Sequence, residues 1–163
     1  MNPATDLTSA YIGNFRQIDD NLFAGAQPEI SEGIVELAST YKVKTIVDLQ
    51  AVLAGEADAC NAAGISFHSI PLPGVEIVTD PPHDKIEAIM SVVNDPANAP
   101  VCVHCLHGAD RTGAIIGIYR VENGATAGEA IDEMRRYHNS WIEAGYRDVV
   151  EDFYEDRVQH KQF

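Results

Sequence analysis

The segment VHCLHGADRTG, residues 103–113, joins an apolar run to a helix-forming run. The residues before it, in APVCV (99–103), are short and apolar and predict a buried strand. The residues after it, AIIGIYRV (114–121), belong to a predicted helix from about Arg111 to Glu122. The segment is therefore predicted to be a loop at the carboxyl end of a strand, which is where α/β sheets bind ligands.

Within this loop, five residues separate Cys105 from Arg111. A loop that leads into a helix can direct several backbone N–H groups at one centre, and the helix N-terminus adds partial positive charge. Gly108 permits a tight turn and a close approach to an anion, while the Arg111 guanidinium can hold two phosphate oxygens. The same positive surroundings favour the thiolate of Cys105, so the loop would bind a phosphate and activate a nucleophile beneath it.

The remaining sequence alternates between strand and helix patterns. Strands are predicted within FRQIDDNLFAGAQP (15–28, two strands around a turn), KTIVDL (44–49) and ISFHSIPL (65–72). Helices are predicted near 31–41 with Ser31 as N-cap, 54–64, 84–94 and 146–159, and after a capping box of Thr126 and Glu129. These elements predict an α/β fold with a central, mostly parallel sheet flanked by helices, in a single domain over residues 1–163.

The composition excludes several classes of partner. With 25 acidic and 11 basic residues the net charge is −14, which argues against general binding to nucleic acid or anionic membranes. No apolar run is long enough to span a membrane, and no secretory signal pattern opens the sequence. Three cysteines do not suggest a disulfide framework, so we expect free thiols and a cytoplasmic location.

The motif His104-Cys105-x5-Arg111-Thr112 resembles the signature of the cysteine-dependent protein tyrosine and dual-specificity phosphatases. NLFAGAQP, followed by a helix and VKTIVDL, also resembles the opening of small dual-specificity domains, so the resemblance covers roughly residues 15–155. It implies an enzyme that hydrolyses phosphate monoesters through a phosphocysteine, with no metal or organic cofactor.

The resemblance also implies roles for the site residues. Cys105 would attack phosphorus, Thr112 would hydrogen-bond its sulfur, and His104 would orient the loop and stabilise the thiolate. The residues expected to bind the phosphate are Leu106, His107, Gly108, Ala109, Asp110 and Arg111.

Cleavage of the P–O bond also needs a general acid, which the family keeps upstream of the cysteine. Asp80, in the turn-rich segment VTDPPHD (78–84), is the predicted acid. Three alternatives remain: Asp84, which is placed to cap the next helix, Glu76, and Asp110 just before the signature arginine.

The substrate is less well defined than the reaction. The loop has no lysine, unlike the basic loops of inositol-lipid phosphatases, which argues against highly charged polyphosphates and favours phosphotyrosine or aryl phosphates on a phosphoprotein or small ester. Inositol phosphates and other non-protein phosphates remain an alternative. From other classes, a silent phosphate-binding module and a rhodanese-like sulfurtransferase are the rivals. The sequence does not indicate an oligomeric state.

Other polar and sulfur-containing residues have plainer expected roles. Cys102 and Cys105 form a C-x-x-C spacing, but in a strand their side chains would point to opposite faces, so we expect Cys102 to be packing. A disulfide that protects Cys105 from overoxidation is the alternative. Cys60 and His68 are expected in the core, and His107 either adds charge to the site or lies exposed on its rim.

Overall fold

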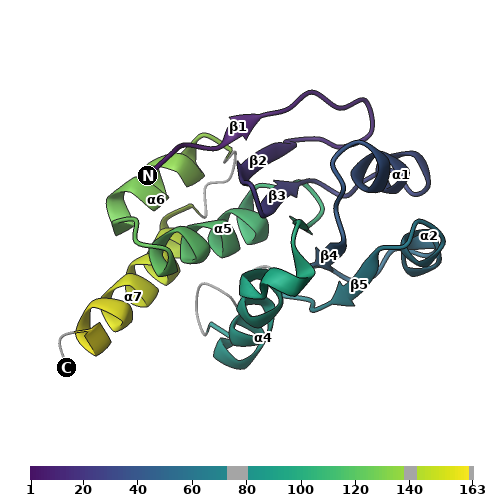
Figure 1. The fold of residues 1–163 in the computed structure, drawn as a ribbon. Coiled ribbons are helices and arrows are strands. Elements are labelled where there is room, and N and C mark those ends of the chain that lie inside the picture. The colour runs from purple at the N-terminus through teal and green to yellow at the C-terminus, as the bar shows by residue number, and fades with distance from the viewer. Residues whose placement is uncertain (73–80, 138–142, 162–163) are drawn as a thin grey trace.

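A six-stranded sheet forms the centre of the fold (Figure 1). The computed structural model describes residues 1–72, 81–137 and 143–161. The strand order is β1-β2-β3-β6-β4-β5, with β1 to β3 antiparallel and β3, β6, β4 and β5 mutually parallel. The predicted α/β sheet is therefore confirmed. The strands are β1 (Thr5–Asp6), β2 (Arg16–Asp19), β3 (Leu22–Gly25), β4 (Thr45–Asp48), β5 (Ser66–Ser69) and β6 (Val101–His104).

Helices cover both faces of this sheet (Figure 1). Two short helices, α1 (Glu32–Ser39) and α2 (Glu56–Ala62), lie against one face. The other face is covered by α4 (His83–Asn94), α5 (Asp110–Glu122), α6 (Ala127–Arg135) and α7 (Glu143–Lys161), and a short 3-10 helix, η1 (Pro96–Asn98), follows α4. Helix α5 packs between α6 and α7 and is buried along nearly its whole length. It is the helix that begins at the predicted phosphate loop.

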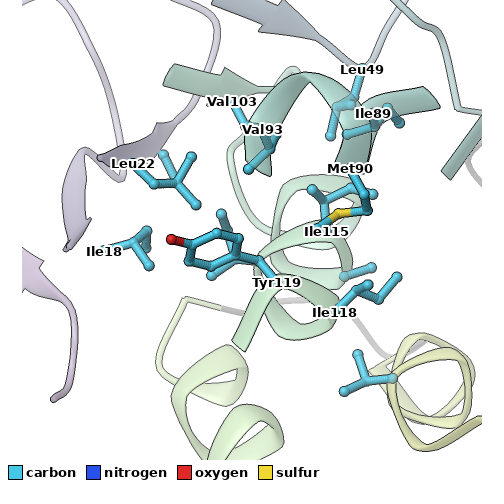
Figure 2. Close-up of a cluster of buried hydrophobic side chains, with 14 of the residues drawn as sticks. Ile18, Leu22, Leu49, Ile89, Met90, Val93, Val103, Ile115, Ile118 and Tyr119 are labelled. Atoms are coloured by element: carbon cyan, nitrogen blue, oxygen red, sulfur yellow. The ribbon is translucent and has the colours of Figure 1, made fainter. Parts of the chain in front are cut away.

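Alternate residues of the central strands enter two different apolar clusters. Phe23, Cys102 and Ile46 are register neighbours on β3, β6 and β4, and all three pack on the α1/α2 side. Val103 and Val47, one position further along, pack on the α4–α7 side, in the cluster that Figure 2 shows. This period of two places consecutive residues of β6 on opposite faces.

The structure confirms two of three predicted helix N-caps in position. Ser31 stands at the N-cap of α1, but its φ is 84° and its side chain makes no capping hydrogen bond. Pro82, not Asp84, is the N-cap of α4, so Asp84 is an exposed residue of the first turn instead of the predicted cap. The capping box of Thr126 and Glu129 at α6 is confirmed.

Within the described residues, none of the helices has both the length and the apolar character that a bilayer-spanning helix needs.

Candidate active site

Residues 105–109, here called the signature loop, connect β6 to α5 at the carboxyl end of the parallel strands. Cys105 is 3% exposed and packs in the cluster on the α4–α7 side. Leu106 and His107 are exposed, and Ala109 is buried. The loop therefore starts with a nearly buried thiol and has an exposed rim.

Three consecutive carbonyl groups of the loop accept hydrogen bonds from the N-terminal part of the chain. In a trans peptide the N–H points opposite to the C=O. The N–H groups of His107, Gly108 and Ala109 therefore face away from the groups that donate to the three carbonyls. The structure offers these N–H groups no acceptor among the residues it describes, so they remain available to an anion. The three bonds are Gln27 N–H to Leu106 O (3.1 Å), Asn14 Nδ2 to His107 O (2.8 Å) and Arg16 Nη1 to Gly108 O (3.0 Å).

Gly108 lies against the end of β3. Its φ is +69°, and a Cβ at this position would come within 2.4 to 2.6 Å of the backbone of Gly25 and Ala26. Both the left-handed conformation and the close approach require glycine. The close approach that the structure shows is to the neighbouring strand, and the predicted close approach of Gly108 to an anion stays a prediction.

The side chain of Arg111 is held from behind by two carbonyl groups. Its Nη1 donates to Leu49 O at 3.4 Å and to Leu72 O at 3.3 Å, both beyond the carboxyl ends of neighbouring strands. The half-buried guanidinium has further N–H groups with which it can bind phosphate oxygens. Arg111 therefore lies at the same edge of the sheet as Cys105.

His104, the residue before the cysteine, belongs to a cluster with no exposed surface. Its Nε2 lies 2.6 Å from Oε1 of Glu56 on α2, and its Nδ1 lies 3.3 Å from the carbonyl oxygen of Cys105. Asp48, its register neighbour on β4, has Oδ1 3.8 Å from Nδ1. We call Asp48, Glu56 and His104 the buried triad. The Glu56 carboxylate and the Cys105 carbonyl thus fix the orientation of the His104 ring next to the loop.

Burial raises the pKa of Asp48 to about 6, although the charge of His104 and the N–H of Gln50 lower it. The three side chains lie close enough to bind a metal ion together. However, the 2.6 Å hydrogen bond between His104 and Glu56 leaves no space for an ion between them. The His104–Glu56 hydrogen bond therefore holds the triad together, with Asp48 at 3.8 Å from the ring.

The remaining predicted residues take different positions. Thr112 is buried, and its Oγ1 has no hydrogen-bond partner in the described part of the chain, so the predicted bond to the Cys105 sulfur is not formed here. Asp110 is the half-buried first residue of α5. The predicted acid Asp80 and its rival Glu76 lie outside the described residues.

The other sulfur and histidine predictions were partly right. All three cysteines are free, and Cys102 and Cys105 pack on opposite faces of the sheet, which opposes the alternative of a protective disulfide between them. Burial raises the pKa values of Cys60 and Cys102 to about 12, so both are unreactive packing residues. His68 lies on edge strand β5 and is half-buried, so its predicted core position is wrong.

Sequence reasoning missed Arg16, Asn14, Glu56 and Asp48. Arg16 is 1% exposed and lies on the same face of β2 as buried Ile18. The alternating pattern of this strand could therefore have indicated that the arginine points into the fold. Glu56 precedes buried Cys60 by four residues on α2, which places both on one helix face. No local pattern marks Asn14, because its partner lies 93 residues away.

Comparison with known proteins supports the resemblance. A family described as DSP-PTPase phosphatase fused to NAD+ kinase matches residues 8–152. Inositol diphosphatase DSP1 of rice (Oryza sativa subsp. japonica) is 28% identical over 127 residues, which cover 76% of this chain and 56% of that protein. Inositol diphosphatase SIW14 of Saccharomyces cerevisiae is 30% identical over 98 residues, which cover 59% of this chain and 34% of that protein. The chain thus spans only about half, or less, of these relatives.

Solved structures agree on the fold. The catalytic domain of the PP-IP phosphatase Siw14 of S. cerevisiae superposes with a TM-score of 0.76 at 21% identity, covering 95% of this chain and 96% of that one. TpbA of P. aeruginosa in complex with pTyr gives a TM-score of 0.66 at 20% identity, covering 95% of each chain. By its family match and its fold, the chain belongs to the family of DSP-PTPase phosphatases fused to NAD+ kinase, within the cysteine-dependent dual-specificity phosphatase-like superfamily.

Proposed function

We propose that this chain hydrolyses phosphorylated small molecules or proteins through a phosphocysteine on Cys105. The observation that carries the proposal is the signature loop, which has a nearly buried thiol, N–H groups with no acceptor in the described part of the chain, and the guanidinium of Arg111 at one edge of the sheet. Such an arrangement stabilises negative charge on a transferring phosphoryl group.

The proposed reaction has two steps. The Cys105 sulfur attacks phosphorus and the P–O bond to the leaving group breaks, while the leaving oxygen takes a proton from an acid that we assign to Asp80. Water then attacks phosphorus, gives its proton to the resulting carboxylate, and displaces the thiolate. Thr112 assists the second step, because its buried hydroxyl is available to hydrogen-bond the departing sulfur.

Inositol diphosphates are the first substrate class to test, because two relatives carry the name inositol diphosphatase. A different observation favours aryl phosphates such as phosphotyrosine. Leu106 in the loop is 51% exposed, and Val52 and Leu53, which follow the adjacent strand β4, are each 48% exposed. Of these, Leu106 belongs to the loop that carries the thiol, and an exposed apolar side chain there suits an aromatic ring better than a polyphosphate.

The test is metal-free turnover of para-nitrophenyl phosphate, phosphotyrosine and an inositol diphosphate by the same protein preparation. We expect Cys105→Ser to abolish turnover of every substrate. Asp80→Asn should lower kcat by on the order of 100-fold or more for leaving groups that need a proton, and less for para-nitrophenolate. Asp84→Asn is the matched control, because Asp84 is exposed in the first turn of α4.

Turnover that survives Cys105→Ser would refute the phosphocysteine route. Tight phosphate binding without turnover would favour the silent binding module. A much higher kcat/KM for the inositol diphosphate than for phosphotyrosine would select the first substrate class, and the reverse ratio would select the second.

A further inference from the structure

We propose that Arg16 is a positioning residue, which keeps the signature loop ready to bind an anion by holding the Gly108 carbonyl away from the loop centre. The inference deepens the proposed function and rests on it. Arg16 comes from β2, about ninety residues before the loop, and its Nη1 donates to Gly108 O at 3.0 Å.

The Gly108–Ala109 peptide is the weak point of the loop. Gly108 has a φ of +69° and no side chain to restrict rotation of this peptide. If the peptide rotated by half a turn, its carbonyl would take the place of the Ala109 N–H and would repel a phosphate. The hydrogen bond from Arg16 opposes that rotation, because it would be broken.

The Arg16 guanidinium has a fixed position of its own. The side chain is 1% exposed, and Nη1 also donates to Asn14 O at 2.9 Å. Its Cζ lies 3.9 Å from the ring centroid of Tyr137, whose hydroxyl donates to Asp6 Oδ1 at 2.6 Å. A cation stacked on an anchored ring and bonded to two carbonyls can hold the loop without moving itself.

Electrostatics point the same way. Burial lowers the pKa of Arg16, while nearby Tyr137, Glu133 and Cys105 oppose this decrease. Cys105 is thus one of the groups whose negative charge favours the charged form of Arg16. An apolar side chain at this position, such as methionine, could supply neither that charge nor the hydrogen bond.

A second buried arginine provides the matched control. Arg120 is 7% exposed and pairs with Glu133 through Nε at 3.0 Å and Nη2 at 2.9 Å. It belongs to the same buried polar region as Arg16, but no hydrogen bond links it to the signature loop. Loss of either arginine lowers stability, whereas only loss of Arg16 frees the Gly108 peptide.

The experiment measures tungstate binding by calorimetry, together with KM and kcat for para-nitrophenyl phosphate, in wild type, Arg16→Met, Arg16→Lys and Arg120→Met. All measurements are made well below the unfolding temperature of each variant. We expect Arg16→Met to weaken tungstate binding by roughly 10- to 100-fold, since a hydrogen bond from a charged donor is lost. Arg16→Lys should recover part of the affinity, and Arg120→Met should stay within about threefold of wild type.

Unchanged tungstate affinity in Arg16→Met, or an equal loss in Arg120→Met, would overturn the inference, as would a wild type that binds no tungstate. If Arg16→Met does not fold, Arg16→Lys decides: weaker binding supports the positioning role, and wild-type binding overturns it. Because tungstate binding needs no turnover, an Arg16-dependent affinity in a protein without phosphatase activity would leave this inference standing while the proposed function failed.

Discussion

Two sets of residues support the signature loop from opposite sides, and they differ in charge and in the groups that they contact. The N-terminal support (Asn14, Arg16 and Gln27) donates hydrogen bonds to three loop carbonyls. The buried triad (Asp48, Glu56 and His104) lies on the other face of the sheet and contacts the Cys105 carbonyl through His104. The comparison teaches that loop shape and charge at the thiol depend on separate parts of the fold.

Among the variants proposed as tests, removal of a member of the buried triad should lower the free energy of unfolding most. Glu56→Ala leaves the fully buried His104 without the carboxylate that lies 2.6 Å from its Nε2. We expect the free energy of unfolding to fall by roughly 3–5 kcal/mol, as for other broken buried pairs. Urea unfolding measures this loss.

Glu56→Gln is the matched control, since it keeps the shape and an acceptor oxygen. It should cost clearly less than Glu56→Ala. If both variants lost under 1 kcal/mol, the triad would not support the loop.

A Cβ at Gly108 should displace the signature loop from its N-terminal support. Gly108→Ala would force the loop away from the Gly25 and Ala26 backbone, which lies 2.4 to 2.6 Å from the added atom. We expect kcat/KM for para-nitrophenyl phosphate to fall by about 100-fold, since a 1 Å displacement of a catalytic group can cost that much. Gly124→Ala is the control: its φ is +104°, with nothing within 4 Å of the added Cβ. It should destabilise by about 1 kcal/mol and leave kcat/KM unchanged. Equal activity of the two variants would contradict the tight packing of Gly108.

The raised pKa of Asp48 predicts that the stability difference between wild type and Asp48→Asn changes with pH. Its folded pKa of about 6 exceeds the usual value of 3.8, so the folded state holds the proton more tightly than the unfolded state. This contribution to stability is present below pH 4 and is lost as the pH rises through 6. Asp48→Asn removes the loss and keeps an acceptor for the Gln50 N–H, which donates to Oδ1 at 2.9 Å.

Relative to wild type, Asp48→Asn should therefore gain stability between pH 4 and 6. The gain should reach roughly 2–3 kcal/mol by pH 8, since one pKa unit corresponds to about 1.4 kcal/mol. Unfolding free energies at pH 4, 6 and 8 measure it. A stability difference that does not change with pH would mean that Asp48 is ionised throughout.

Substitution of Cys102 should have the smallest effect on stability and turnover. Cys102 packs on the face of the sheet away from Cys105. Cys102→Ala removes one buried sulfur atom and should cost about 1 kcal/mol with unchanged turnover. In the folded wild type, iodoacetamide should modify Cys105 and spare Cys60 and Cys102, because burial raises the pKa of both to about 12. Peptide mass spectrometry identifies the modified cysteine. Loss of turnover in Cys102→Ala would show that both faces of β6 contribute to the chemistry.

The sequence by itself determined the elements and the place of the chemistry. Apolar periodicity, the Thr126–Glu129 capping box and the glycines that end segments are local signals, so most predicted strands and helices agree with the structure within a few residues. The spacing of Cys105 and Arg111 is also local, because one loop and one helix start hold both residues.

Only the tertiary structure decided what surrounds that loop. Strand order places β6 between β3 and β4, and this brings Arg16 and Asp48 to opposite sides of residues more than fifty positions away. The burial of Arg16, Glu56 and His104 is compensated by hydrogen-bond partners, and several of these partners come from distant elements. For that reason the nucleophile could be read from a short motif, while the residues that hold it required the folded chain.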